Sequence, residues 1–439
     1  MNNTATPTDP FIQRLFSIRD QIARGELPAA AQALNEAQKV SPGDPRLFIL
    51  GTLMAEKSGN AKGAQEIARR AVAAAPRWSV AVIELALLLA RQNQFKEALE
   101  QAHRAVDLAP NDPNMLMHGV DIAHRAQHPE QALQWLRRAD ALVPGNLRIQ
   151  HLIAQDLAAT GQRAQALDAL TALHEAHPEN ADILLDATKA AISLQKKRVS
   201  QTLARRLVAL APDNEEYKFW QQIAQGKTPA TQIAGDVTAL FDQFAEKFDQ
   251  HLVRGLQYQM PRVIAERIKV RYPGLKLNVL DLGCGTGLLG VCLGRIDGAL
   301  VGVDLSMKMI EQAARHGVYD RFHNVNLLDA LQATPDSLYE VITAADVFIY
   351  VGDLSQAIPN ACRILVPGGR LMFSCEAATD DEADYVLHAD NMRYAHKASH
   401  VQALCKAAGF DDVLIEATDL RLEKGQPVKG FIVEAHKPL

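Results

Sequence analysis

The distribution of apolar residues divides the chain into two parts with different periodicities. In the first half, apolar residues recur at helical spacing, as at Val82, Leu85 and Leu89, and small residues repeat with a fixed period. From residue 236 onward, apolar runs of strand length alternate with helical patterns. The pattern predicts a multidomain protein, in which an all-α helical-repeat solenoid precedes an α/β doubly wound, Rossmann-like domain with a mostly parallel sheet.

Three columns of residues define the repeat. A small side chain lets two helices approach closely, and a proline ends the second helix of each pair. The columns resemble the tetratricopeptide repeat, whose period is 34 residues, although the aromatic positions of that family are largely missing. A generic helical bundle has no reason to repeat on a fixed period. The columns are Pro42, Pro76, Pro110, Pro144, Pro178 and Pro212; Ala30, Ala64, Ala98, Ala132 and Ala166; and Ala37, Ala71, Ala105 and Ala139.

Changes in composition predict the domain boundaries. The repeat stops near residue 226, after a stretch at 214–225 that predicts a helix closing the apolar end of the stack. The next ten residues have the turn-rich composition of a linker. The sequence therefore predicts a tetratricopeptide-like domain at 1–225, a linker at 226–235 and a second domain at 236–439.

Composition and charge make several classes of protein unlikely. A net charge of −5 argues against non-specific nucleic-acid binding, which needs a basic field. The N-terminus shows no apolar segment of a secretory signal, and the longest apolar run, residues 80–90, contains Glu84 and is too short to cross a bilayer. The 5 cysteines form no C-x-x-C pair. We therefore expect a cytoplasmic protein with reduced thiols, no membrane contact and no metal site.

A glycine-rich turn at residues 278–290, NVLDLGCGTGLLG, is the main chemical motif of the second domain. A short apolar strand precedes the turn and a helix follows it, so a ligand can approach the backbone closely. The dinucleotide pattern G-x-G-x-x-G would need glycine at Leu288. Instead, Asp281 precedes Gly283, Gly285 and Gly287. This order resembles the first motif of the class I methyltransferases, which use S-adenosyl-L-methionine.

The resemblance extends over nearly all of residues 236–439 and implies a set of cofactor-binding residues. Asp304 closes a predicted strand at 299–303 and would accept hydrogen bonds from both ribose hydroxyls. Asp329, after a weak predicted strand at 324–328, would take the adenine amino group, and its alternative role is a helix N-cap. The full set implied by the resemblance is Asp281, Gly283, Gly285, Gly287, Asp304, Leu305, Asp329, Ala330, Asp346, Phe248 and Tyr258.

A helix predicted at 240–258 supplies the last two of those residues. It resembles the opening helix of a bacterial subgroup that fuses such repeats to a methyltransferase, in which Phe248 and Tyr258 would belong to a lid over the methionine end of the cofactor. The apolar stripe of this helix is equally compatible with a simple core-facing surface.

Methyl transfer requires mainly that an acceptor be aligned with the activated methyl group and that water be excluded. A base is needed only where the acceptor must first lose a proton. The candidates are Asp346, which follows a predicted strand at 341–345, together with Glu376, Tyr394, His396 and His400. A lone loop histidine is more often a surface or capping residue. We expect Arg393 to pair with the acidic run at 380–382 rather than with an acidic acceptor.

Two functions remain open at this level. In the first, the repeats recruit a protein or peptide substrate in a concave groove, lined by Met117, Asp121, His124, Arg148, His151 and Gln155. In the second, a quinone or another small metabolite is methylated, and the repeats serve homodimerisation or docking. An inactive scaffold is disfavoured because the cofactor motifs are intact.

Overall fold

The computed structural model describes residues 9–245, 258–389, 391–423 and 425–439. By their internal contacts, the residues fall into two compact units that divide between Leu210 and Ala211. The division falls before the helix that the sequence assigns to the end of the repeats, and the predicted boundaries at 225 and 235 remain predictions. The two units are described separately below.

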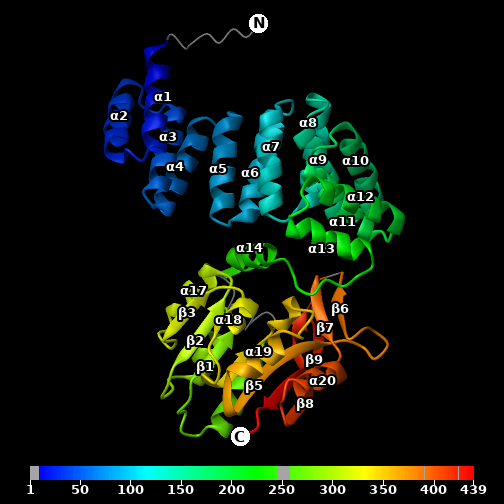
Figure 1. Cartoon of the computed structure of the whole chain (residues 1–439). Helices are drawn as coiled ribbons and strands as arrows, with labels where there is room; N and C mark the ends of the chain where they lie inside the picture. Colours follow the sequence, from blue (N-terminus) through cyan, green and yellow to red (C-terminus); the bar gives the residue numbers. More distant parts are fainter. Residues whose placement is uncertain (1–8, 246–257, 390, 424) are drawn as a thin grey trace. The chain divides into compact units, whose positions relative to one another are not determined.

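Unit 1 is a row of paired antiparallel helices, visible in sequence order in Figure 1. Each pair packs its first helix against its second, and the first helices of several successive pairs also contact one another. The helices are α1 (Pro10–Ala23), α2 (Leu27–Val40), α3 (Pro45–Lys57), α4 (Ala61–Ala74), α5 (Ser79–Arg91), α6 (Phe95–Leu108), α7 (Pro113–Arg125), α8 (Pro129–Leu142), α9 (Leu147–Ala159), α10 (Arg163–Ala176), α11 (Ala181–Ser193) and α12 (Lys197–Leu210).

The proline column marks the ends of the second helices, as the sequence predicts. In each of the six pairs, the second helix stops two residues before the proline of its unit. The residue between them is forced out of the helical region because the proline ring restricts its backbone. Ser41, Ala75 and Ala109 show this directly, with φ of −135°, −138° and −137°.

The alanine columns lie where the helices meet. Ala30, Ala64, Ala98, Ala132 and Ala166 are all 0% exposed. A larger side chain at such a position would force the helices apart, because protein interiors are close-packed. These buried columns and the helical pairs confirm the repeat fold.

Unit 2 is built on one mixed sheet with helices around it. Its helices are α13 (Glu215–Ala224), α14 (Ala234–Phe244), α15 (Met260–Arg271), α16 (Leu288–Leu293), α17 (Met307–Ala314), α18 (Leu327–Ala333), α19 (Ala357–Ile364) and α20 (Ala398–Ala407), with a 3-10 turn at Phe348–Tyr350. Its strands are β1 (Val279–Leu282), β2 (Leu300–Asp304), β3 (Arg321–Asn324), β4 (Tyr339–Ala344), β5 (Leu365–Ala377), β6 (Tyr385–His388), β7 (Arg393–His396), β8 (Asp412–Glu423) and β9 (Gln426–His436).

The order of the strands locates the ligand-binding edge of the sheet. The main path runs β3-β2-β1-β4-β5-β7-β6, and strands β1 to β5 are parallel. β9 joins β5 in the antiparallel direction and also pairs with β8. The path reverses between β1 and β4, and ligands of doubly wound sheets bind beyond the carboxyl ends of the strands at such a reversal.

Some element boundaries differ from the sequence-based expectation. The weak strand predicted at 324–328 is β3, which ends at Asn324, and residues 327–333 are helical. The helix predicted to begin at Leu240 begins instead at Ala234. Phe248 lies outside the described residues.

Candidate functional site

The glycine turn follows β1 and needs glycine for two separate reasons. Gly283, Gly285 and Gly287 have φ of +62°, +53° and +83°, which L side chains rarely adopt. A Cβ atom on Gly283 would also lie 2.5 Å from a methyl carbon of Val347. Val347 thus packs against the turn at Gly283 and leaves no room there for a side chain, and α16 begins immediately after Gly287.

Asp304, at the end of β2, is bound to this turn. Its Oδ2 accepts a hydrogen bond from the backbone N–H of Gly285 at 2.9 Å, and its Oδ1 accepts one from the N–H of Ser306 at 2.8 Å. Burial raises the pKa of Asp304, and these backbone hydrogen bonds oppose the rise. Each oxygen retains a lone pair, so the carboxylate can still accept hydroxyl groups of a ligand.

Asp281 lies on β1 beneath the turn and is 2% exposed. It accepts hydrogen bonds from the Tyr319 hydroxyl at 2.6 Å and from Thr343 Oγ1 at 2.8 Å. Burial raises the pKa of Asp281 to about 6, despite these two donors. The side chain is thus an anion near neutral pH that accepts a proton in mild acid.

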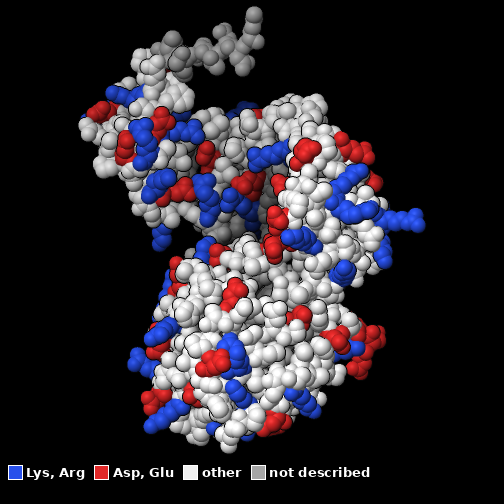
Figure 2. Space-filling model, viewed as in Figure 1, with Lys and Arg blue, Asp and Glu red and all other residues white. Residues whose placement is uncertain are grey.

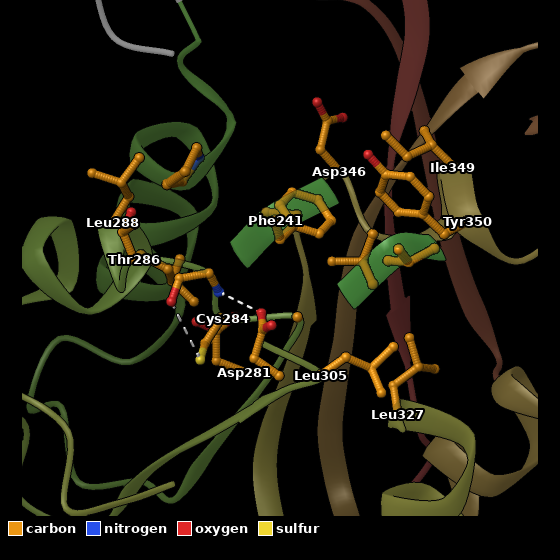
Figure 3. A pocket seen from close by; sticks show the side chains of 18 of the residues that line it. Phe241, Asp281, Cys284, Thr286, Leu288, Leu305, Leu327, Asp346, Ile349 and Tyr350 are labelled. Atoms are coloured by element: carbon orange, nitrogen blue, oxygen red, sulfur yellow. Dashed lines mark hydrogen bonds between the residues drawn. The ribbon is translucent and has the colours of Figure 1, made fainter. Parts of the chain in front are cut away.

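A cavity of about 450 Å³ opens at this edge of the sheet (Figure 3). Most of its wall is apolar, and its charged groups lie at the turn and at the end of β4. It is lined by Val237, Leu240, Phe241, Phe244, Tyr258, Pro261, Asp281, Gly283, Cys284, Gly285, Thr286, Leu288, Leu289, Asp304, Leu305, Val325, Leu327, Ala345, Asp346, Val347, Ile349, Tyr350, Arg393 and Arg421. Size and lining suit an organic ligand that carries both apolar and polar groups.

Helix α14 forms one wall of this cavity and is held by two contacts. The ring of Phe241 meets Tyr350 edge to face, with centroids 5.5 Å apart. Asp242 accepts a hydrogen bond from the Ser306 hydroxyl at 2.5 Å. Since Ser306 also donates its N–H to Asp304, the helix is connected to the carboxylate that faces the glycine turn.

A buried cluster of charges surrounds the end of β4. Asp346 has a φ of +56°, and its Oδ2 accepts a hydrogen bond from Arg421 at 2.7 Å. Arg421 also pairs with Glu376 and lies 3.3 Å from Glu423. Burial alone would lower the pKa of Arg421, but the carboxylates of Asp346 and Glu376 raise it. Arg421 therefore stays charged within this cluster.

Arg393 belongs to the same cluster and corrects an expectation from the sequence. Its guanidinium pairs with Glu423 and lies 3.8 Å from Glu376. The predicted pairing with residues 380–382 is therefore wrong, because Arg393, the first residue of β7, reaches Glu423, the last residue of β8.

The structure brings most of the predicted cofactor residues to one cavity. Asp281, Gly283, Gly285, Asp304, Leu305, Asp346 and Tyr258 all line it. Burial and the neighbouring Asp346 raise the pKa of Tyr258 well above its ordinary value.

Gly287 shapes the turn without lining the cavity. Asp329 and Ala330 stand on α18 outside the lining, and Asp329 is exposed. The N-cap of that helix is Asn326, so the alternative role of Asp329 as a cap is wrong.

Tyr394 and His396 do not line the cavity. Tyr394 is 0% exposed, and its hydroxyl donates to the carbonyl oxygen of Pro229 at 2.9 Å. His396 is 1% exposed, with Nε2 at 3.0 Å from the carbonyl oxygens of Val351 and Gly352. Burial lowers the pKa of His396 to about 4. Neither side chain reaches the cavity, and we assign no catalytic role to either.

Several cavity residues were missed by the reading of the sequence. Arg421 lies far from the motifs along the chain, and only the pairing of β8 with β9 and of β9 with β5 brings it to the cavity. Phe241 falls within the predicted helix at 240–258, but nothing in the sequence distinguishes it from its apolar neighbours. Tyr350 follows β4 closely, and an aromatic residue so near the ligand edge is the one available signal.

A second candidate surface lies on the first helices of unit 1. Nε2 of His124 lies 2.9 Å from both carboxylate oxygens of Asp156, and Nε2 of His151 lies 2.8 Å from Asp186. Gln155 donates to Asp186 at 2.8 Å. These bonds join α7 to α9 and α9 to α11, so three of the predicted groove residues are held in place by the following repeat.

Comparison with known proteins identifies both parts. Residues 280–373 match the family model of the methyltransferase domain, and residues 83–146 match that of the tetratricopeptide repeat. The chain thus combines tetratricopeptide repeats with a class I methyltransferase domain, the class that uses S-adenosylmethionine.

Individual relatives match only part of the chain. The ubiquinone biosynthesis O-methyltransferase of Coxiella burnetii (strain RSA 493 / Nine Mile phase I) is 33% identical over 99 residues, which are 22% of this chain and 42% of the relative. The protein of the same name from Xanthomonas oryzae pv. oryzae (strain PXO99A) is 27% identical over 124 residues, 26% of this chain and 52% of the relative. The chain therefore spans about half the length of the curated relatives it matches.

Solved structures resemble each part separately. The magnesium protoporphyrin IX methyltransferase of Synechocystis PCC 6803, with bound SAH, has a TM-score of 0.37 and 20% identity, and the match covers 46% of this chain and 99% of that one. YrrB, a TPR protein with an unusual peptide-binding site, has a TM-score of 0.38 and 16% identity, covering 43% of this chain and 98% of that one.

Two further features of the described residues concern membranes and metal ions. No helix there combines the length and apolarity needed to cross a bilayer. Within the same residues, no group of three or more His, Cys, Asp or Glu side chains is arranged to hold a metal ion.

Proposed function

We propose that the chain is an S-adenosylmethionine-dependent methyltransferase whose N-terminal repeats recruit a protein or peptide substrate. The observation that carries the proposal is the bond between Asp304 and the N–H of Gly285, which places a carboxylate at the backbone of the glycine turn where both residues line the cavity. Gly283 itself packs against Val347 with no room for a Cβ, so glycine at this position lets neighbouring groups approach the backbone closely.

The cofactor would be held by residues that already converge on the cavity. Asp304 would accept the ribose hydroxyls, and Gly283 and Gly285 would allow close approach of the backbone. Asp281 would supply negative charge beneath the turn, and Tyr258 would close the far side. Asp329 and Ala330 remain proposed contacts of the adenine. When bound, the cofactor supplies an already activated methyl group, so the protein needs chiefly to orient the acceptor and exclude water.

Asp346 is the proposed contact of the methyl acceptor. Its side chain lines the cavity, and its Oδ2 accepts a hydrogen bond from Arg421 at 2.7 Å. A carboxylate has more lone pairs than this one bond uses, so Asp346 can also accept a hydrogen bond from the group that is methylated.

Recruitment by unit 1 rests on the mixed chemistry of its surface. Figure 2 shows acidic and basic side chains interspersed over the drawn face of the repeats rather than gathered into a patch of one sign. The first helices carry Arg148, which is exposed, beside the fixed pairs of His124 and His151. Such a surface suits a peptide with charges of both signs. We also propose a reducing, cytoplasmic location, because all five cysteines are free thiols.

The second candidate is methylation of a small metabolite, with the repeats used for dimerisation or docking. Two observations favour it: the aromatic wall of the cavity at Phe241 and Tyr350, and the ubiquinone biosynthesis enzymes among the relatives of residues 280–373.

Methyl-labelled S-adenosylmethionine, incubated with the full-length protein and cell extract, separates the two candidates. Label in macromolecules supports recruitment of a protein, and label in small molecules supports the second candidate. Arg148→Glu should reduce labelling of a protein substrate, whereas Arg137→Glu, on the exposed side of α8, is the matched control. Equal labelling by the two variants would contradict recruitment through the first helices.

A further inference from the structure

The chain segment that leads into α14 is fastened to the cavity domain by backbone hydrogen bonds. We call residues 229–232 the strap. The N–H of Gln232 donates to the carbonyl oxygen of Tyr350 at 3.0 Å, and the N–H groups of Gly352 and Asp353 donate to the carbonyl oxygen of Ala230 at 2.8 and 2.9 Å. Thr231 and Val351 form an antiparallel bridge. The strap is thus paired, strand-like, with residues 350–353.

Strand β7 fastens the strap from a second direction. The Tyr394 hydroxyl donates to the carbonyl oxygen of Pro229 at 2.9 Å, and the side-chain amide of Gln232 donates to the carbonyl oxygen of Met392. These bonds account for both ends of the strap. The ring of Tyr394 also leaves no room for a side chain on Gly352, since a Cβ there would lie 2.6 Å away from it.

His396 contacts residues 351 and 352, which belong to the segment paired with the strap. Its Nε2 lies 3.0 Å from the carbonyl oxygens of both Val351 and Gly352. Two acceptors at one nitrogen require that nitrogen to carry the proton. Burial lowers the pKa of His396 to about 4, so the ring is neutral at physiological pH and Nε2 is its donor. His396 therefore fixes the backbone to which the strap is paired.

The fastened residues are directly connected to the cavity wall. Tyr350 precedes the bridged Val351 and lines the cavity, and Phe241 stands on α14, which begins two residues after the strap. Their rings meet edge to face (Figure 3). One wall of the cavity therefore depends on the pairing of the strap with residues 350–353. Tyr394 and His396 stabilise that pairing from outside the cavity.

We propose that Tyr394 and His396 are positioning residues, which fasten the strap and the 350–353 backbone so that Tyr350 and Phe241 close the ligand cavity. Ligand in the cavity and attachment of the strap then stabilise each other, because coupling between two sites is reciprocal. The inference rests on the proposed function only in taking the cavity ligand to be S-adenosylmethionine or its product.

The test uses the full-length protein and two tyrosine variants. Tyr394→Phe keeps the ring and removes only the hydroxyl that bonds Pro229. Tyr385→Phe is the matched control, because Tyr385 packs against the same glycine and, among the described residues, its hydroxyl has no recorded hydrogen bond. His396→Gln, which keeps one amide donor, changes the second positioning residue.

Two measurements are made on each variant. Trypsin cleavage after Lys227, an exposed residue just before the strap, is followed by mass spectrometry of the fragments. Affinity for S-adenosylhomocysteine is measured by calorimetry. We expect Tyr394→Phe to accelerate this cleavage and to weaken the affinity by about two- to tenfold each, as the loss of one hydrogen bond between neutral groups predicts. Tyr385→Phe should change neither.

The ligand dependence of cleavage tests the coupling itself. Saturating S-adenosylhomocysteine should slow cleavage at Lys227 in the wild-type protein. Faster cleavage in Tyr394→Phe with unchanged affinity would overturn the inference, since the strap would then be purely structural. Unchanged cleavage and unchanged affinity in both Tyr394→Phe and His396→Gln would also overturn it. If the wild-type protein bound neither S-adenosylmethionine nor S-adenosylhomocysteine, the proposed function would fail. The cleavage rates would still show whether Tyr394 and His396 fasten the strap.

Discussion

Arg421 Nη1 lies 2.7 Å from Asp346 Oδ2, and the two side chains are only 4% and 13% exposed. This pair joins the end of β4 to β8 at the wall of the cavity. Removing one member of a buried ion pair leaves the other charge without a partner, which costs more than the pair itself contributes.

Arg421→Met is therefore expected to lower the free energy of unfolding by about 3 kcal/mol, because Asp346 and Glu376 lose their buried cation. Urea denaturation gives this value, and Arg421→Lys should lose less. In the double variant with Asp346→Asn, the total loss should be smaller than the sum of the two single losses. Additive losses would show that the two side chains do not interact in solution.

Asp304→Ala is expected to weaken binding of S-adenosylmethionine by about 30- to 150-fold, or about 2–3 kcal/mol, because the carboxylate would no longer accept the ribose hydroxyls. Calorimetry measures the affinity, and circular dichroism establishes that the variant is folded. Asp336→Ala, which removes an exposed carboxylate of the same domain, is the control. A folded Asp304 variant with wild-type affinity would contradict the assignment.

Gly283→Ala is expected to destabilise the turn and to weaken cofactor binding, because the new Cβ would lie 2.5 Å from Val347 in a backbone conformation with φ of +62°. The double variant Gly283→Ala with Val347→Ala removes the clash and should recover part of the loss in thermal melting temperature. The strain of the positive φ, about 1 kcal/mol, should remain. Full recovery would mean that the backbone conformation carries no cost.

His396 should make folding stability depend on pH in mild acid. Its pKa is lowered to about 4 in the folded protein from an ordinary value of 6.5, so the unfolded chain takes up the proton first as the pH falls. The free energy of unfolding should thus decrease below about pH 6.5 and level off below about pH 4, by about 3 kcal/mol in all. Chemical denaturation from pH 8 to 4 measures this.

The matched variant for that titration is His396→Gln, which has no ionisable group. Its curve should lack the component due to His396, so the difference in stability between wild type and variant should shrink as the pH falls. A constant difference across this range would show that His396 is not buried in its neutral form.

The repeat and the glycine turn could be predicted from the sequence because their causes are local. The prolines end the helix that precedes them, and Gly283, Gly285 and Gly287 are required by the backbone of one short turn. Asp304 was recognised for the same reason, since it ends the strand that follows the turn in sequence. In each case the residue type and a fixed spacing contain the information.

The rest of the site depends on contacts between distant segments. Arg421 reaches Asp346 across 75 residues, through the pairing of three strands. Tyr394 and His396 are of residue types that often act in catalysis, but here they bond to backbone carbonyl groups. The residue type alone does not predict such partners. The sequence predicts that Arg393 pairs with residues 380–382, whereas it pairs with Glu423 at the end of β8.

In unit 1, the positions that the fold requires differ from the positions that a binding partner would contact. Each alanine of the buried columns is fully enclosed between helices, whereas Arg148 and the other exposed positions of the first helices contribute nothing to that packing. Substitution at the exposed positions should therefore be almost free of a folding cost, about 0.5 kcal/mol or less in either direction. Evolution can consequently exchange the surface chemistry of such repeats, one helix at a time, while the scaffold stays the same.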